Sequence, residues 1–81
     1  MNNDDAYRDL VFAALRATTS DGPYAEQCAL STAVDRWAGQ NGVGPVPIES
    51  LVRIADSAGY THFQTERRGY FAGLSLKEDY A

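Results

Sequence analysis

One cysteine, one histidine and two pairs of adjacent acids are the residues whose types could support catalysis. Cys28 has no basic residue one helical turn away that would activate its thiol. His62 lies near no serine or cysteine in a recognisable nucleophile setting, so we interpret it as a surface or rim histidine. The acid pairs Asp4-Asp5 and Glu78-Asp79 lie near the chain ends, where nothing fixes their geometry. The sequence therefore predicts no catalytic residue and a protein that is not an enzyme.

Residues that hold metals or cofactors are equally scarce. A single cysteine and a single histidine exclude a cysteine-based zinc site and a histidine cluster. Gly39, Gly42 and Gly44 lie close together, but their segment lacks the lysine of a phosphate-binding loop and follows no predicted strand. We therefore expect a flexible connector between two helices, with no cofactor and no bound metal.

Two segments rich in glycine and proline, 20–23 and 39–47, divide the 81 residues into three parts of one small domain. Apolar residues spaced three and four apart predict the first and third helices. Pro23 at a first helical position predicts where the second begins, and Asn3 or Asp4 can cap the first. The expected helices cover about 4–18, 23–38 and 47–58. Trp37 is expected to make the largest apolar contribution to the core.

From residue 60 the pattern alternates, which predicts a β-hairpin over about 60–77 and a frayed tail over 77–81. A turn at Arg68-Gly69 would place Phe63 beside Leu74. The inner face would then hold Thr61, Phe63, Thr65, Tyr70, Ala72 and Leu76. The outer face would hold Tyr60, His62, Gln64, Glu66, Phe71 and Ser75. A three-residue turn through Gly69 would exchange the faces of the second strand, and this alternative stays open.

These elements predict an α+β fold, in which three helices precede an antiparallel hairpin in one domain over 1–81. A short edge strand over 43–46 is a further option. The apolar share of 44% and the aromatic share of 11% are globular values. No apolar run approaches the roughly 18 residues of a membrane span, and the chain opens with acids instead of a basic leader. We expect a cytoplasmic protein without a membrane segment.

Residues 48–60, followed by a hairpin with Arg67-Arg68 at its tip, resemble the C-terminal part of a winged helix-turn-helix domain. The resemblance implies that the helix over 47–58 enters the major groove while the tip arginines touch phosphate or the minor groove. The long second helix and the glycine-proline connector depart from that family. The candidate DNA-reading face carries Glu49, Ser50, Asp56 and Ser57 against a single cation, Arg53. We therefore expect a winged-helix-like fold that does not bind nucleic acid directly.

Seven basic and eleven acidic residues give a net charge of −4, which favours a protein partner with a basic surface. Phe12, flanked by Arg8 and Arg16, and Phe71, beside Tyr60 and His62, are expected on outward faces. Exposed aromatic residues anchor many protein interfaces. The candidate partner-binding residues are Asp5, Asp9, Phe12, Glu49, Asp56, Glu66 and Phe71. The acids among them would form either a charged stripe or a polar rim around an aromatic anchor.

Six arginines against one lysine, with many alanines and glycines, indicate a GC-rich coding sequence of bacterial or phage origin. In size, acidity and lack of catalytic residues the chain resembles the small anti-CRISPR proteins of phages, a group without a shared motif. The resemblance implies an inhibitor that blocks a nucleic-acid-binding or nuclease-recruiting surface of a CRISPR effector complex in the host cytoplasm. The alternatives are a winged-helix DNA-binding regulator and a small adaptor or antitoxin-like subunit.

Overall fold

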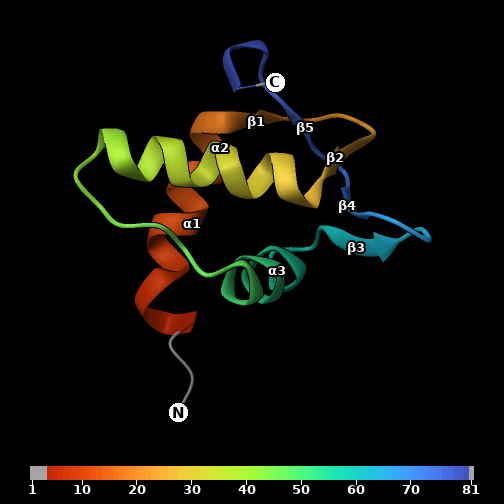
Figure 1. Cartoon of the computed structure of the whole chain (residues 1–81), viewed down its shortest axis with the longest axis horizontal. Coiled ribbons are helices and arrows are strands. Elements are labelled where there is room, and N and C mark those ends of the chain that lie inside the picture. Colours follow the sequence, from red (N-terminus) through yellow and green to blue (C-terminus); the bar gives the residue numbers. More distant parts are fainter. Residues whose placement is uncertain (1–3, 81) are drawn as a thin grey trace.

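The computed structural model describes residues 4–80, in which three α-helices combine with one three-stranded and one two-stranded antiparallel sheet (Figure 1). The α+β class expected from the sequence is confirmed. The helices are α1 (Asp4–Thr18), α2 (Gln27–Gln40) and α3 (Ile48–Ser57). The strands are β1 (Thr19–Ser20), β2 (Tyr24–Glu26), β3 (Thr61–Gln64), β4 (Gly69–Ala72) and β5 (Ser75–Leu76), and a 3₁₀ turn, η1 (Glu78–Tyr80), follows.

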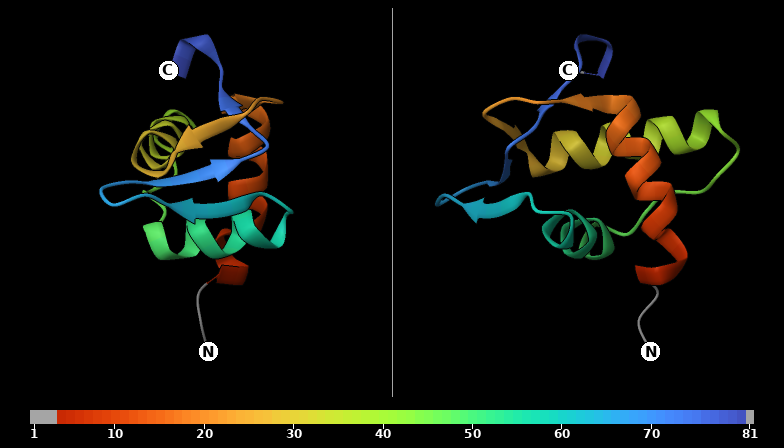
Figure 2. Two further views of the ribbon diagram at one scale, coloured as in Figure 1. Left: turned by 90° about the vertical axis from the view of Figure 1, so that its right-hand side faces the viewer. Right: turned by 180° about the vertical axis from the view of Figure 1, so that it is seen from behind.

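The three-stranded sheet has the order β2-β4-β3 and lies at one side of the molecule. The left view of Figure 2 shows these strands in front, with α1 behind them and with α2 and α3 near opposite edges of the sheet. The helices therefore cover one face of the sheet and leave the other face open. Within residues 4–80, no helix combines the length and the apolar character needed to cross a membrane.

Helix α1 covers the residues expected from its apolar spacing. Val11, Ala14 and Leu15 are buried on its inner side, as residues three and four apart on a helix must share one face. The hydroxyl of Thr18 donates to the carbonyl of Ala14 over 2.8 Å and so satisfies a carbonyl near the helix end. The proposed cap Asn3 lies outside the described residues.

Helix α2 begins at Gln27 and not at Pro23, so the expected start of the second helix is wrong. The residues after Pro23 form β2, which pairs antiparallel with β4. Ala25 is buried between the exposed Tyr24 and the half-buried Glu26, which is the alternation of a strand. Pairing with a distant strand has overridden the local preference of proline for a helix start.

The turn between β3 and β4 is centred on Glu66 and Arg67 instead of Arg68-Gly69. The amide of Thr65 donates to the carbonyl of Arg68 over 2.8 Å and closes this turn. Phe63 consequently pairs with Tyr70 and not with Leu74. The shift is an even number of residues, so the expected grouping of side chains on each face survives for residues 61–72 while the pairs themselves change. It is wrong for Leu74, which is 1% exposed and joins the core with Phe71 instead of lying beside Phe63.

The orientation of the two faces is the reverse of the expectation. Phe71 is 0% exposed and is the largest fully buried side chain, whereas Phe63 is 40% exposed. Phe71 joins a core that includes Val11, Leu30 and Leu51, contributed by the three helices. Trp37 is half-buried and packs against this core from its border.

The expected second strand of the hairpin is divided at Gly73, whose φ of +96° belongs to the left-handed region that favours glycine. Beyond this residue, the chain leaves the β2-β4-β3 sheet, and β5 pairs with β1. The expected frayed tail is also wrong for η1. The Tyr80 hydroxyl donates to Oε1 of Gln40 over 3.3 Å, and the Arg36 guanidinium lies 5.3 Å from the centre of the Tyr80 ring.

The connector between α2 and α3 forms neither the optional edge strand nor a loosely attached loop. The amide of Val46 donates to Oδ1 of Asp35 over 2.9 Å, and the Val46 side chain is buried. Gly42, with φ of +75°, turns the chain at the end of α2. The connector therefore fixes where α3 starts relative to α2.

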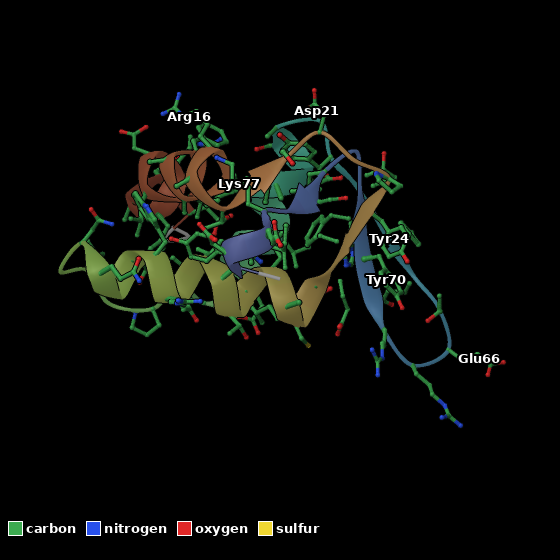
Figure 3. The ribbon with its side chains drawn as sticks, turned by 90° about the horizontal axis from the view of Figure 1, so that it is seen from above. Arg16, Asp21, Tyr24, Glu66, Tyr70 and Lys77 are labelled. Carbon is green, nitrogen blue, oxygen red and sulfur yellow. The ribbon has the colours of Figure 1, made fainter. Side chains whose placement is uncertain are left out.

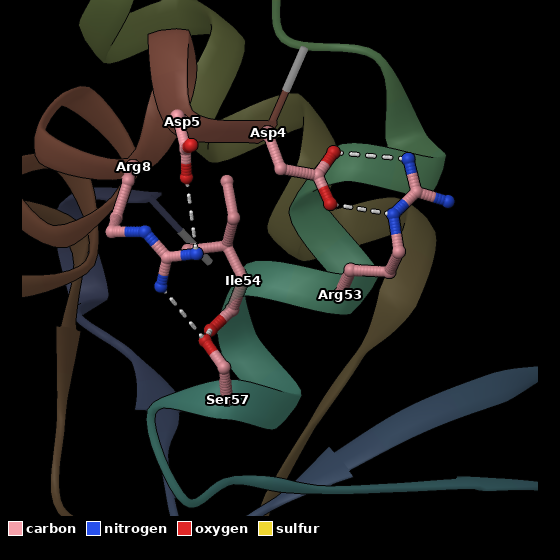
Figure 4. Close-up of polar contacts among 6 residues, drawn as sticks. All are labelled: Asp4, Asp5, Arg8, Arg53, Ile54 and Ser57. Carbon is pink, nitrogen blue, oxygen red and sulfur yellow. Dashed lines mark hydrogen bonds and ion pairs between the residues drawn. The ribbon is translucent and has the colours of Figure 1, made fainter. Parts of the chain in front are cut away.

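Helices α1 and α3 are joined by a two-point ion pair (Figure 4). Nε and Nη2 of Arg53 donate to the two carboxylate oxygens of Asp4 over 2.6 and 2.9 Å. Arg8 makes a second, longer link, since Nη1 donates to the Ser57 hydroxyl over 3.4 Å and Nη2 lies 3.6 Å from Oδ1 of Asp5. The hydrogen bonds from Arg53 hold the pKa of Asp4 below its ordinary value, against the opposing effect of burial.

The burial of Phe71 can be tested against Phe63, which is the same residue type on the opposite face. Phe71→Ala should lower the free energy of unfolding by about 3–5 kcal/mol because it leaves a cavity in the core. Phe63→Ala should cost far less, since its ring already contacts water. Urea denaturation followed by circular dichroism measures both. Equal losses would mean that the faces of β3 and β4 are wrongly assigned.

The Asp4–Arg53 pair predicts a pH dependence of stability. Because the folded state lowers the pKa of Asp4, the pair stabilises the fold above the ordinary aspartate pKa of about 4 and is lost as the pH falls through the folded value. Asp4→Asn and Arg53→Gln should each flatten the fall in stability below about pH 4. Chemical denaturation at several pH values measures this, and wild-type slopes in both variants would contradict it.

Candidate functional site

Three aromatic side chains, one from each strand, gather on the open face of the β2-β4-β3 sheet. Tyr24 and Phe63 are 56% and 40% exposed, and Tyr70 between them is half-buried. The Tyr70 ring meets the Tyr24 ring edge-on, with centroids 5.5 Å apart, and is stacked on the Phe63 ring at 5.3 Å. Figure 3 shows Tyr24 and Tyr70 directed away from α1 and α2. We call Tyr24, Phe63 and Tyr70 the aromatic face.

A hollow of about 210 Å³ lies within the aromatic face, and Thr65 completes its lining. Glu26 stands at its border because it is in register with Tyr70 across the β2–β4 pair. Nη1 of Arg68 lies 3.6 Å from Oε2 of Glu26, so a carboxylate and a guanidinium share this border. The aromatic face thus presents large exposed rings beside an arginine, and both residue types are enriched in protein interfaces.

Sequence reasoning missed all three residues of the aromatic face. The sequence predicts Tyr24 in a helix, and Phe63 and Tyr70 on the inner side of the hairpin. Two signals could have located them. The order Tyr24-Ala25-Glu26 alternates as a strand does, and a tyrosine hydroxyl favours a position where it reaches water, unlike the phenyl ring of Phe71.

The candidate acids from the sequence are exposed but do not form one stripe. Asp5 and Asp9 are exposed on α1, and Glu49 and Asp56 are exposed on α3. Arg8 and Arg53 stand at the junction of the two helices and pair with Asp5 and Asp4. Glu66 lies apart at the β3–β4 turn (Figure 3). The arrangement suits a scattered polar rim better than a continuous negative surface.

The two candidate aromatic anchors from the sequence have different surroundings. Phe71 is completely buried, so it cannot anchor a partner, and its expected outward position is wrong. Phe12 is half-buried and packs against the core. It also contributes to a second hollow of about 570 Å³ between the end of α1 and the segment before β3. The residues that line this hollow are Phe12, Leu15, Arg16, Thr19, Ser20, Asp21, Ala58 and Tyr60.

The arginines that a DNA-binding winged helix would use are largely engaged within the chain. Arg53, the single cation on the outer side of α3, holds both oxygens of Asp4. Arg68 pairs with Glu26. Arg67 forms no ion pair with the residues that the structure describes. Neutralising these cations inside the fold weakens their attraction for phosphate.

The residues whose types could support catalysis are dispersed. Nε2 of His62 lies 2.6 Å from Oε1 of Gln27, and its ring lies 5.0 Å from that of Phe71, so His62 faces inward and not outward as expected. Cys28 is exposed on α2. Over the range 4–80, no three side chains of the metal-binding types gather closely enough to hold a metal ion.

Comparison of the chain with protein-family models, with curated proteins and with solved structures finds no match in any of the three.

The engagement of Arg53 and Arg68 predicts that the protein does not bind duplex DNA at an ionic strength of about 0.15 M. In a mobility-shift assay with genomic fragments, we expect no retardation at this ionic strength. Retardation of one fragment that is weakened by Arg53→Ala or Arg67→Ala would contradict the prediction and favour a DNA-binding regulator.

Proposed function

We propose that the chain is a non-enzymatic protein-binding module that docks on its partner through the aromatic face. The observation that carries the proposal is the exposure of Tyr24 and Phe63 around Tyr70 on a face of the sheet that no element among residues 4–80 covers. The fold places these three positions on the open face, but it does not require aromatic residues there, since the opposite face already supplies the core. Large rigid rings bring contact area at a low entropy cost, so they suit binding.

The charge of the chain supports a partner with a basic surface. The net charge is −4, and Asp9, Glu49, Asp56 and Glu66 are exposed without an ion pair among residues 4–80. Such carboxylates speed association with a positively charged surface over distances of about 10 Å. On this proposal, the scattered acids increase the rate of association with the partner, and the aromatic face decreases the rate of dissociation.

The proposed partner is a protein that handles nucleic acid, because basic grooves are the working surfaces of such proteins. By occupying the groove, the chain would keep nucleic acid out or prevent a nuclease from being recruited. This is the steric blockade implied by the resemblance to phage anti-CRISPR proteins, with a subunit of a CRISPR effector complex as the target in the host cytoplasm. No bond is made or broken in this mechanism.

The test is inhibition of target-DNA binding by a panel of purified CRISPR effector complexes. The wild-type protein should block one of them in a fluorescence-anisotropy assay. Tyr24→Ala combined with Phe63→Ala should weaken inhibition by at least about tenfold, the effect of losing one interface anchor. Val43→Ala is the matched control, since Val43 is 41% exposed in the connector and outside the aromatic face.

Circular dichroism must show that the double variant is folded. If the wild-type protein inhibits none of the effector complexes, the proposed target is wrong. Undiminished inhibition by the folded double variant would overturn the aromatic face as the docking surface.

A further inference from the structure

We infer that the hollow of the aromatic face receives a positively charged side chain of the partner, an arginine or a lysine, by cation–π contact. This inference rests on the proposed function and specifies the chemistry of the partner at that site. Three observations support it: the arrangement of the rings, the position of Glu26, and the lack of a cation over these rings among residues 4–80.

All three rings line the hollow. Tyr24 stands at 87° to Tyr70, and Phe63 lies at 16° to Tyr70. A group seated among them meets more than one ring at once. Aromatic faces attract cations through their quadrupole, and sites of several rings bind quaternary ammonium groups for this reason. A hollow of about 210 Å³ has room for the end of one such side chain.

The chain does not fill this site with a cation of its own. Among residues 4–80, the one cation that lies over an aromatic ring is Arg36, above Tyr80 on the opposite end of α2. Arg68 is close to the hollow, but its guanidinium is held 3.6 Å from the carboxylate of Glu26. The three rings can therefore attract a cation from a partner.

The negative charge of Glu26 favours a cation over a neutral or anionic occupant of the hollow. Its carboxylate is on the same face as Tyr70 and is only partly shielded, so it can accept a second hydrogen bond from an arriving ammonium or guanidinium group. Glu66 at the adjacent turn adds a further negative charge. The phosphates of a single-stranded nucleic acid would meet both carboxylates.

The test uses tetramethylammonium chloride as the cationic probe and tert-butanol as a neutral probe of similar size. Proton NMR of the full chain follows the ring signals during each titration, with sodium chloride as the ionic-strength control. We expect tetramethylammonium to shift the signals of Tyr24, Phe63 and Tyr70 in a saturable manner at millimolar concentration. We expect tert-butanol and sodium chloride not to do so.

Variants separate a cation–π site from a merely apolar one. Tyr24→Leu and Phe63→Leu retain apolar side chains but remove a ring, and each should weaken the binding of the probe at least about threefold. Tyr24→Phe retains the ring and should bind the probe as the wild type does. Binding that is equal for tert-butanol, or unchanged in both leucine variants, would overturn the inference. So would tighter binding of an oligothymidylate than of the cationic probe at the same three rings.

These outcomes are distinct from those that test the proposed function. If the cationic probe does not bind but the alanine double variant loses inhibition, the docking surface stands and its cation chemistry is wrong. If the probe binds at the three rings but no effector is inhibited, the cation site stands and the proposed target is wrong.

Discussion

The burial of Phe71 is the constraint on which the rest of the structure depends. Its ring fills the space between the β2-β4-β3 sheet and the helices, where it is fully buried with Leu30 and Leu51. Because side chains alternate along a strand, burying Phe71 places Tyr70 on the opposite face. The register then places Phe63 and Tyr24 on that same open side. The aromatic face is therefore a direct consequence of how the core is filled.

Helices α1 and α3 were predictable from the sequence because their signals are local. Leu51, Ile54 and Ala55 on α3 are spaced as one buried stripe, and the same holds for α1. Strand β2 was not predictable in this way, since it is held by β4, more than forty residues later. The sequence also did not predict which face of the hairpin is buried. Both of its sides carry aromatic residues, and only the position of the helices decides which side is buried.

Several of the charged side chains hold the fold together. Arg53 and Arg8 make polar contacts where α1 meets α3. Because Arg53 is the single cation on the outer side of α3 and pairs with Asp4, no unpaired cation remains on that side. Arg68 is similarly tied to Glu26 beside the aromatic face. A winged-helix-like fold thereby presents a surface that is poor in available positive charge. Such a surface attracts the phosphates of DNA only weakly.

The most direct test of this account is the solvent exposure of the individual rings on the two faces of the sheet. A neutral, soluble gadolinium chelate increases the NMR relaxation rates of protons near the protein surface. The account predicts strong enhancement for the ring protons of Tyr24 and Phe63, an intermediate effect for Tyr70 and almost none for Phe71. Enhancement of Phe71 to the level of Phe63, or protection of Tyr24 and Phe63, would contradict it.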